Sequence, residues 1–495
     1  MNAKSSRIKK YQWGLISFFS LVILFLIHLP FLNADPDINL CCYRDAFHME
    51  GITTIQLRNY FNLGYLSFTE GDMLLKQPFF NLTLFFPFKF FGTHLIVARL
   101  TVMITFIISM LVFAKISSMV KIIPVLCLTI LLQYHIFQYT HFAMPELMAI
   151  GMILISIGFL ARYVSDEKSR QQSLFFACLF SFLACCMKIL YFYILILVPL
   201  SLLLFQFSVS AMVPRRHLLN TVLWLVLFSA VYFFAWYLPN ASFYNYIMTV
   251  QNAMRLEWHH DLLQIIYSNV RYNLLLPQSR IFVLLCLIIF PLGLWEWFKT
   301  RDLRFKIIFI AAFLWMVLEL HKIIYAYFPP RYQVSIFFSA GLMSCIVIYH
   351  FLFSAESNVK KKIVAYILLI AFCLVGATDY CGLYSRKQFA IEDVNEYMKR
   401  TVHDPHEAVL GLWAPGLTWE SKSRAIPVWY NFLNDKSTMT IFKPISAIIV
   451  EPQREGGDIE FASQGIDLNA VSDSVKTFTI GHSILKLYWI KQEKK

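Results

Sequence analysis

The chain is built from long apolar runs that are separated by short polar segments. The first run, residues 13–32, follows a group of Lys and Arg residues within positions 4–10. An apolar run of about 20 residues is long enough to cross a bilayer as an α-helix. Ten further runs lie at about residues 94–114, 119–138, 145–161, 171–187, 190–209, 218–238, 281–298, 307–321, 333–353 and 363–381. We therefore predict an α-helical polytopic membrane protein with about 11 transmembrane helices.

The basic residues favour one orientation of these runs. They gather in alternate turns, which carry Lys115 and Lys121, then residues 162–170, then Arg215 and Arg216, then residues 299–306, and then residues 360–362. Cytoplasmic loops carry an excess of Lys and Arg, so these turns and the N-terminus are predicted to face the cytoplasm. The third run and the pair formed by the fifth and sixth runs are also compatible with re-entrant segments.

Composition agrees with a membrane protein and limits its partners. The chain is 58% hydrophobic and 15% charged, whereas soluble proteins are about 25% charged, which excludes an ordinary soluble enzyme. The formal net charge of +13 sits in the basic turns, so we expect no nucleic-acid partner. The compact outer regions, without large soluble insertions, favour a bacterial inner membrane.

Three segments on the predicted outer side are longer than simple connections need to be. They are residues 33–93, 239–280 and 382–495. In the first segment, apolar positions at helical spacing predict a helix over residues 52–63. An aromatic-rich stretch at residues 78–91 is typical of a helix that lies in the membrane interface against lipid.

The tail differs in composition from the rest of the chain. A helical pattern near residues 391–401 is followed by strand-like strings at residues 408–413, 445–450 and 484–490. Such an arrangement predicts a small α/β domain. We therefore divide the chain into a membrane domain, residues 1–381, and a C-terminal extracytoplasmic domain, residues 382–495.

Candidate acids lie at the outer ends of the predicted helices. Asp45 and Glu50 follow the first run, and Glu146 opens the fourth, in a short turn that also contains His141. A carboxylate at such a place is a candidate general base or metal ligand. The alternative is an acid in a first helical turn that offsets the helix dipole.

Candidate cations share this outer face. Lys76 precedes the interfacial helix, Lys188 lies between two spans, and Arg331 opens a late span close to Tyr325. A guanidinium can hold a phosphate with two hydrogen bonds. The alternatives are a snorkelling anchor for Lys76, an ion pair with Glu146 for Lys188 and an aromatic belt for Tyr325. Together the cations and acids fit a substrate with a lipid tail, a phosphate and a polar head.

The order of these motifs resembles that of the GT-C membrane glycosyltransferases. The similar branch contains dolichyl-phosphate-mannose protein mannosyltransferases and bacterial lipid A aminoarabinose transferases. The motifs that carry the resemblance are Met49-Glu50-Gly51, Lys76-Gln77-Pro78, Ala98-Arg99-Leu100, Ala143-Met144-Pro145-Glu146, Cys186-Met187-Lys188 and Pro330-Arg331-Tyr332. The chain departs from the family at Met49 and Leu75, where an acid is usual, so Glu50 is the first and Asp45 the second choice for the catalytic carboxylate.

The resemblance implies a polyprenyl-phosphate-linked sugar donor and an extracytoplasmic acceptor, which is a lipid, a glycan or a protein. One carboxylate deprotonates the acceptor for inverting attack, and Lys76, Lys188 and Arg331 stabilise the leaving phosphate. In that setting Glu146 orients the sugar or the acceptor, and His141 and Tyr325 complete the substrate-binding set. No residue pattern demands a metal, and a divalent ion stays open as a cofactor. The alternatives are a flippase or transporter for a lipid-linked sugar and a catalytically inactive relative of the family.

Overall fold

The structure is a computed structural model that describes residues 3–40, 43–68, 70–209, 213–245, 261–325, 328–429, 433–453 and 457–491, with the side chains of residues 3–11, 43–45, 208 and 273 left out. Within these residues, ten helices are long and apolar enough to cross a membrane, or eleven if one bent pair counts as a span. Each predicted apolar run is mainly helical, and the run at residues 119–138 is broken between Thr129 and Tyr134. The prediction of a polytopic helical membrane protein is confirmed.

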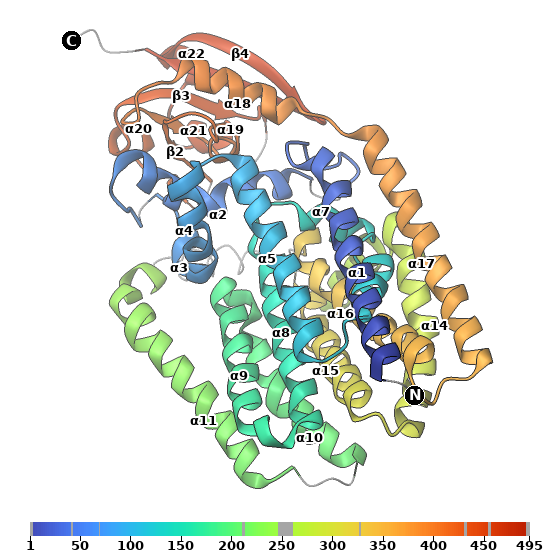
Figure 1. The fold of residues 1–495 in the computed structure, drawn as a ribbon. Helices are drawn as coiled ribbons and strands as arrows, with labels where there is room; N and C mark the ends of the chain where they lie inside the picture. Colours follow the sequence, from blue (N-terminus) through green and yellow to red (C-terminus); the bar gives the residue numbers. More distant parts are fainter. Residues whose placement is uncertain are drawn as a thin grey trace.

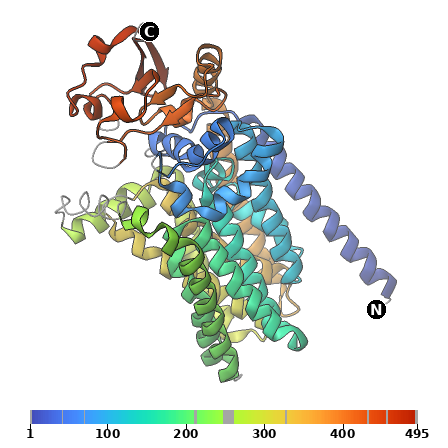
Figure 2. The same cartoon turned by 90° about the vertical axis from the view of Figure 1, so that its left-hand side faces the viewer.

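The spans form one bundle, with α1 at its edge and α11 leaning away from it (Figures 1 and 2). They are α1 (Ala3–His28), α5 (Leu95–Ile116), α6 (Ile122–Thr129) with α7 (Tyr134–Thr140), α8 (Pro145–Ser165), α9 (Arg170–Met187), α10 (Leu197–Val209), α11 (Arg215–Tyr232), α14 (Pro277–Lys299), α15 (Leu303–Glu319), α16 (Pro330–Phe353) and α17 (Val359–Arg386). The span of α10 also includes η3 (Ile189–Ile196), and that of α15 includes η7 (Leu320–Ile324). The short helix α13 (Leu262–Asn269) precedes α14.

Helix α8 forms the centre of the bundle because it is apolar on every side and carries two glycines. A side chain at Gly151 would lie 2.6 Å from the Ser109 hydroxyl, and one at Gly158 would lie 3.1 Å from the Phe113 ring. Small residues let neighbouring membrane helices approach closely. The glycines therefore allow α5 to pack directly against α8.

The third predicted span is broken in two. Helices α6 and α7 meet at an angle of 108°, and the Gln133 side chain accepts a hydrogen bond from Ile136 N (3.0 Å) at the start of α7. This cap satisfies one of the backbone donors that the first turn of α7 would otherwise leave open. The alternative of a re-entrant or broken third segment therefore describes this part of the chain better than a straight helix.

The helices of the first long segment and the C-terminal domain lie at the same end of the bundle, which we call the domain end (Figure 1). The first segment contains α2 (Tyr43–Leu63), α3 (Met73–Lys76) and α4 (Pro78–Phe91). Helix α4 has the bounds predicted for the interfacial helix. After α17 ends at Arg386, the tail begins with α18 (Ala390–Thr401).

The tail folds as the predicted α/β domain around a five-stranded sheet. Its strands are β1 (Ala408–Leu410), β2 (Arg424–Ile426), β3 (Ile445–Val450), β4 (Ser472–Ile480) and β5 (Ser483–Ile490), and its short helices are α19 (Ala414–Leu417), α20 (Thr438–Ile441), α21 (Ile459–Ala462) and α22 (Leu468–Val471). The strand order is β2-β1-β3-β5-β4, with β2, β1 and β3 parallel and β5 antiparallel to both of its neighbours.

The C-terminal domain is docked tightly on α2. A side chain at Gly51 would lie 2.5 Å from the backbone of Gly416, so α2 and α19 touch backbone to backbone. The Arg58 guanidinium donates to Pro415 O (2.5 Å) and lies 4.1 Å from the centre of the Trp419 ring. Because α2 carries Glu50, this contact couples the tail to the candidate site.

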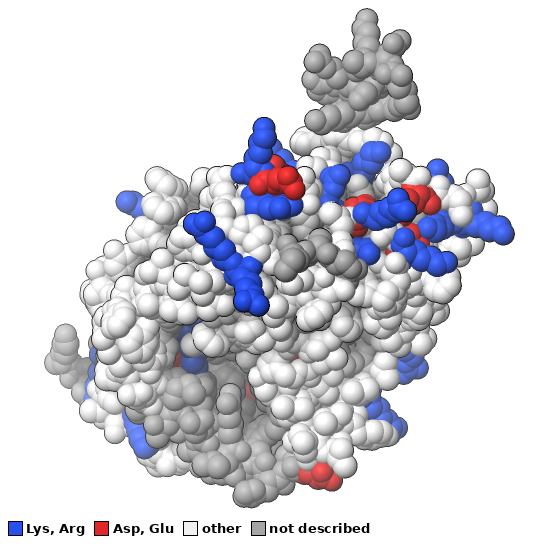
Figure 3. All heavy atoms as spheres, turned by 90° about the horizontal axis from the view of Figure 1, so that it is seen from below, with Lys and Arg blue, Asp and Glu red and all other residues white. Residues whose placement is uncertain are grey.

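The opposite end of the bundle, which we call the basic end, carries the turns rich in Lys and Arg. Figure 3 looks onto it and shows basic side chains on a mostly uncharged surface. All five basic turns of the sequence fall between helices at this end (Figure 1). The bundle thus separates the candidate chemistry from the basic turns.

Candidate functional site

Glu50 is held on all sides by hydrogen bonds. It is 2% exposed, and Arg99 of α5 donates to both of its oxygens, from Nε to Oε1 (2.8 Å) and from Nη2 to Oε2 (2.6 Å). The backbone N–H of Ala143 donates to Oε1 as well (2.7 Å). Arg99 Nη1 also donates to the carbonyls of Leu32 (3.0 Å) and Ala34 (2.8 Å). Glu50 therefore joins α2, α5 and the turn before α8, and its catalytic role stays a prediction.

Glu146 differs from Glu50 because one of its oxygens is left open. Its Oε1 accepts a charged hydrogen bond from Lys188, the residue that follows α9. Its Oε2 is buried and has no hydrogen-bond partner among the described residues. A buried carboxylate oxygen without a partner is rare in native structures and calls for an explanation, such as a functional role.

Lys188 and Arg331 flank one aromatic ring. The Lys188 ammonium lies 4.9 Å from the centre of the Tyr332 ring, and the Arg331 guanidinium lies 5.2 Å from the same centre. Both cations are largely buried, at 7% and 6% exposed. The structure therefore brings Glu146, Lys188 and Arg331 together at the domain end, as the sequence predicts.

A second acid and lysine lie directly beside this group. Glu319, at the end of α15, accepts hydrogen bonds from Tyr193 and from Trp315 Nε1 (2.9 Å) on one oxygen. Its other oxygen accepts from the Ser335 hydroxyl (2.6 Å) and is paired with Lys322. Glu319 and Lys322 are both 0% exposed. The whole assembly is a buried cluster of two lysine–glutamate pairs.

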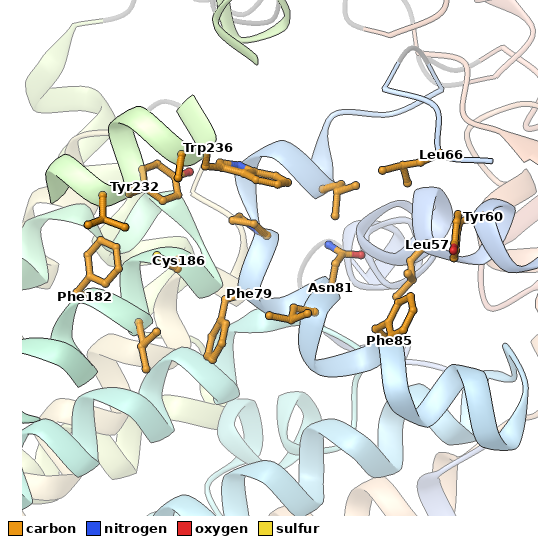
Figure 4. Close-up of a pocket in the computed structure, with 16 residues that line it drawn as sticks. Leu57, Tyr60, Leu66, Phe79, Asn81, Phe85, Phe182, Cys186, Tyr232 and Trp236 are labelled. Atoms are coloured by element: carbon orange, nitrogen blue, oxygen red, sulfur yellow. The ribbon is translucent and has the colours of Figure 1, made fainter. Parts of the chain in front are cut away.

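A wide apolar cavity opens beside the cluster. It has a volume of about 490 Å³ and lies between α2 and α4 on one side and α9 and α11 on the other (Figure 4). Its wall is formed almost wholly by apolar and aromatic side chains, among them Leu57, Tyr60, Phe79, Phe85, Phe182, Leu183, Tyr232 and Trp236. Figure 4 shows these rings around a common space that Asn81 also faces.

Lys76 and Lys188 stand near this cavity from different elements. Leu74 and Pro78, which lie two residues before and after Lys76, line it, and so does Cys186, two residues before Lys188. Lys76, the last residue of α3, is paired with Asp72, the residue that precedes this helix. Lysines from two separate elements therefore stand close to the rim of an apolar cavity.

Three other predicted residues have different surroundings. His141 packs against His28, with their Nδ1 atoms 3.2 Å apart. Burial, together with the charges of His28 and Arg99, lowers the pKa of His141 well below its usual value, so it is neutral at pH 7 and adds no positive charge. The ring of Tyr325 lies 5.4 Å from that of His321 at the edge of the cluster. The side chain of Asp45 lies outside the described residues.

Among the residues that the structure describes, one group of side chains could hold a metal ion, and it lies at the basic end. Glu296, His350 and Glu356 each offer a ligand atom, all within 4.8 Å of one another. Glu296 Oε1 already accepts from Lys361 (2.7 Å) and lies 3.1 Å from His350 Nε2. Because this group is at the far end of the bundle, we assign it no part in the chemistry at the domain end.

Sequence reasoning named Arg99 only as part of a motif and gave it no role, and it left the second lysine–glutamate pair out of the site. The signal for both was a charge within an apolar run, which is costly to bury and therefore a functional hypothesis by default. Arg99 lies in the run at 94–114 and Glu319 in the run at 307–321. In turn, Met49, which stands where the family has an acid, is buried in the hydrophobic core.

Comparison with known proteins shows the fold but no close relative. No protein-family model matches the sequence, and no curated protein matches it. The chain is similar in structure to ArnT from Cupriavidus metallidurans in the apo state, with 12% identity, a TM-score of 0.58 and 97% of this chain and 98% of that chain covered. The same protein bound to undecaprenyl phosphate gives 12% identity, a TM-score of 0.56 and coverage of 96% and 98%.

A second solved protein has the same architecture. The apo oligosaccharyltransferase from Archaeoglobus fulgidus matches with 10% identity and a TM-score of 0.54, covering 88% of this chain and 69% of that chain. Both proteins have the GT-C fold, and the similarity extends over most of the chain in each case. The predicted GT-C fold is therefore confirmed.

Proposed function

We propose that this GT-C-fold chain is a membrane glycosyltransferase that moves a sugar from a polyprenyl-phosphate donor to an acceptor at the domain end. The observation that carries the proposal is the buried Glu146 carboxylate, which has one oxygen paired with Lys188 and the other without a hydrogen-bond partner among the described residues. This arrangement supplies a proton acceptor and a phosphate-binding cation side by side. Glu50, with both oxygens engaged by Arg99, acts as a positioning residue.

The donor fits the site in two parts. Its polyprenyl chain matches the apolar cavity between α4 and α11, because burial of apolar surface favours such a chain over water. Its phosphate matches Lys188 and Arg331, which face the same ring of Tyr332. Undecaprenyl phosphate is bound by an ArnT of the same fold, which supports a lipid phosphate as the donor group here.

In the proposed reaction, the acceptor oxygen attacks the anomeric carbon from the side opposite the phosphate. Its proton passes to Glu146 Oε2, the new glycosidic bond forms, and the bond from the anomeric carbon to the phosphate oxygen breaks. The bonding electrons stay on the polyprenyl phosphate, which needs no general acid because it is a stable anion. Oε2 is enclosed in this conformation, so the acceptor reaches it when the surrounding chain opens.

The charges of the cluster favour a monophosphate donor. Three cations (Lys188, Lys322 and Arg331) and two acids (Glu146 and Glu319) leave a net formal charge of +1. A polyprenyl-phosphate sugar is a phosphodiester with one negative charge, whereas a diphosphate donor carries two. When Glu146 takes the proton, the net charge of the cluster rises to match the second charge that develops on the leaving phosphate.

The orientation of the protein in the membrane is inferred from the position of the basic end. Because Lys and Arg concentrate in cytoplasmic loops, the basic end faces the cytoplasm and the cluster faces the outer side. We place the protein in a bacterial inner membrane, with an acceptor that is an extracytoplasmic lipid, glycan or protein. The proposed steps use no metal ion, and activity in the presence of a chelator is the direct check.

The test is transfer in reconstituted vesicles. Purified protein receives a labelled polyprenyl-phosphate sugar and a membrane extract as the source of acceptor. Wild type is expected to transfer the label, and Glu146→Gln to lose about 10²-fold or more of the rate, as for loss of a general base. Glu296→Gln is the matched control, because Glu296 is an equally buried and paired acid at the basic end, and it should keep its activity.

Two results would overturn the proposal. One is movement of the donor across the bilayer by wild type without transfer to any acceptor, which identifies a flippase. The other is a Glu146→Gln variant that transfers label as fast as wild type.

A further inference from the structure

The second lysine–glutamate pair differs from the first because both oxygens of its carboxylate already have partners. Lys322 and Glu319 are 0% exposed. Both oxygens of Glu319 are engaged, and the Lys322 ammonium also donates to the Ser335 hydroxyl (3.1 Å). In a buried ion pair of this kind the two charges compensate each other, and removal of one partner leaves the other charge buried and uncompensated. Its function must therefore lie in what it does to its neighbours.

The two pairs are linked through η3. Tyr191 N donates to Lys188 O (2.9 Å), so the Tyr191 ring stands one short turn after Lys188. The centre of that ring lies 4.7 Å from the Lys322 ammonium. The charges of Glu319 and Glu146 both act on its hydroxyl group. The positive charges of Lys188 and Lys322 also act on one another. The two lysine–glutamate pairs are therefore within electrostatic reach of one another.

We propose that Lys322 is a positioning residue that decides which acid Lys188 is paired with. Lys322 neutralises Glu319 and repels Lys188, so Lys188 stays on Glu146 and beside the ring it shares with Arg331. Without Lys322, Glu319 would be a buried carboxylate without its counter-charge, and the ammonium of Lys188, whose charge acts on Lys322, would be drawn to it. The donor phosphate would then lose a cation and Glu146 its partner. This inference rests on the proposed function.

A charge-pair experiment tests the inference. Lys322→Met is expected to raise the donor KM about tenfold and to lower kcat, in line with the coupling energies of neighbouring buried groups. The double variant Lys322→Met/Glu319→Gln removes both charges together, so Lys188 has no competing acid. We expect it to return both constants to within about threefold of wild type.

The single and double variants separate positioning from other roles. A double variant as impaired as Lys322→Met would show that the Lys322 ammonium itself is needed, and a Lys322→Met enzyme with wild-type constants would show that it has no role. Either result overturns the inference. A purely structural role would lower the thermal stability of both variants without a change in donor KM.

Two further measurements keep the test decisive. If Lys322→Met does not fold, Glu319→Gln alone is the mirror variant: it leaves Lys322 to compete with Lys188 for Glu146, and the same rise in donor KM is expected. Binding of undecaprenyl phosphate and transfer by wild type are measured first. If wild type shows neither, the proposed function is wrong. If wild type shows both, the variants test the role of Lys322 independently of the proposed function.

Discussion

The backbone contact between α2 and α19 predicts a large effect from one methyl group. In Gly51→Ala the new Cβ would lie 2.5 Å from Gly416 N and from Pro415 C, and 2.9 Å from Gly416 Cα. These atoms belong to the backbone and cannot rotate away. An ordinary contact is about 3.5 Å, so α19 must retreat by about 1 Å. Such overpacking costs about 1–3 kcal/mol.

The matched control is Gly14→Ala in α1. A side chain at Gly14 would meet no atom within 4 Å, and alanine in a helix is favoured over glycine by about 0.5–1 kcal/mol. The same substitution should therefore stabilise α1 slightly and destabilise the contact of α2 with the tail. We expect the two variants to differ by about 2 kcal/mol or more in the free energy of unfolding.

The difference is measured by thermal unfolding of the purified protein. Limited proteolysis of the link at residues 387–389 is the second probe. Gly51→Ala should unfold earlier and release the C-terminal domain faster than Gly14→Ala. Its transfer rate should also fall, because α2 carries Glu50 and a shift of about 1 Å disturbs a preorganised site. Equal unfolding and equal proteolysis of the two variants would refute the reasoning about this contact.

Three further predictions concern Asp35, the apolar cavity and the ion pair of Glu50 with Arg99. Burial raises the pKa of Asp35, in the loop after α1, to about 6 from its usual value of about 3.9. The folded state therefore holds the proton more tightly than the unfolded state, and the free energy of unfolding falls as pH rises from about 4 to 6. In thermal unfolding measured across this pH range, Asp35→Asn should remove that dependence on pH. Leu183→Trp fills the cavity and should raise the donor KM in the transfer assay, whereas Leu287→Trp, on an exposed face of α14, should not. Glu50→Gln leaves Arg99 buried without its counter-charge and should cost about 3–5 kcal/mol of stability, whereas calorimetry of Glu392→Gln, an exposed residue, should show almost no change.

The sequence predicts most of the architecture because a membrane helix can be recognised from its own residues. A run of apolar residues is sufficient to predict a span, and helix α4 and strand β3 (Ile445–Val450) have the predicted bounds. The break between α6 and α7 is harder to predict, since the two helices together are apolar enough to be interpreted as one span.

The candidate site is less accessible to sequence reasoning because its pairings join distant residues. The sequence indicates that Glu146, Lys188 and Arg331 share one face, and they do. It does not indicate that Arg99 occupies both oxygens of Glu50, a contact across 49 positions. Nor does it indicate that the backbone of Pro415 and Gly416, more than 360 residues later in the chain, leaves no room for a side chain at Gly51. Such contacts exist only once the helices are packed.

A structure of the protein with undecaprenyl phosphate tests the central claim most directly. The account predicts the phosphate within about 3.5 Å of Lys188 or Arg331 and the prenyl chain in the cavity lined by Leu57, Phe182 and Trp236. A phosphate bound at the basic end, or a chain that leaves this cavity empty while the phosphate lies far from Glu146, would contradict it.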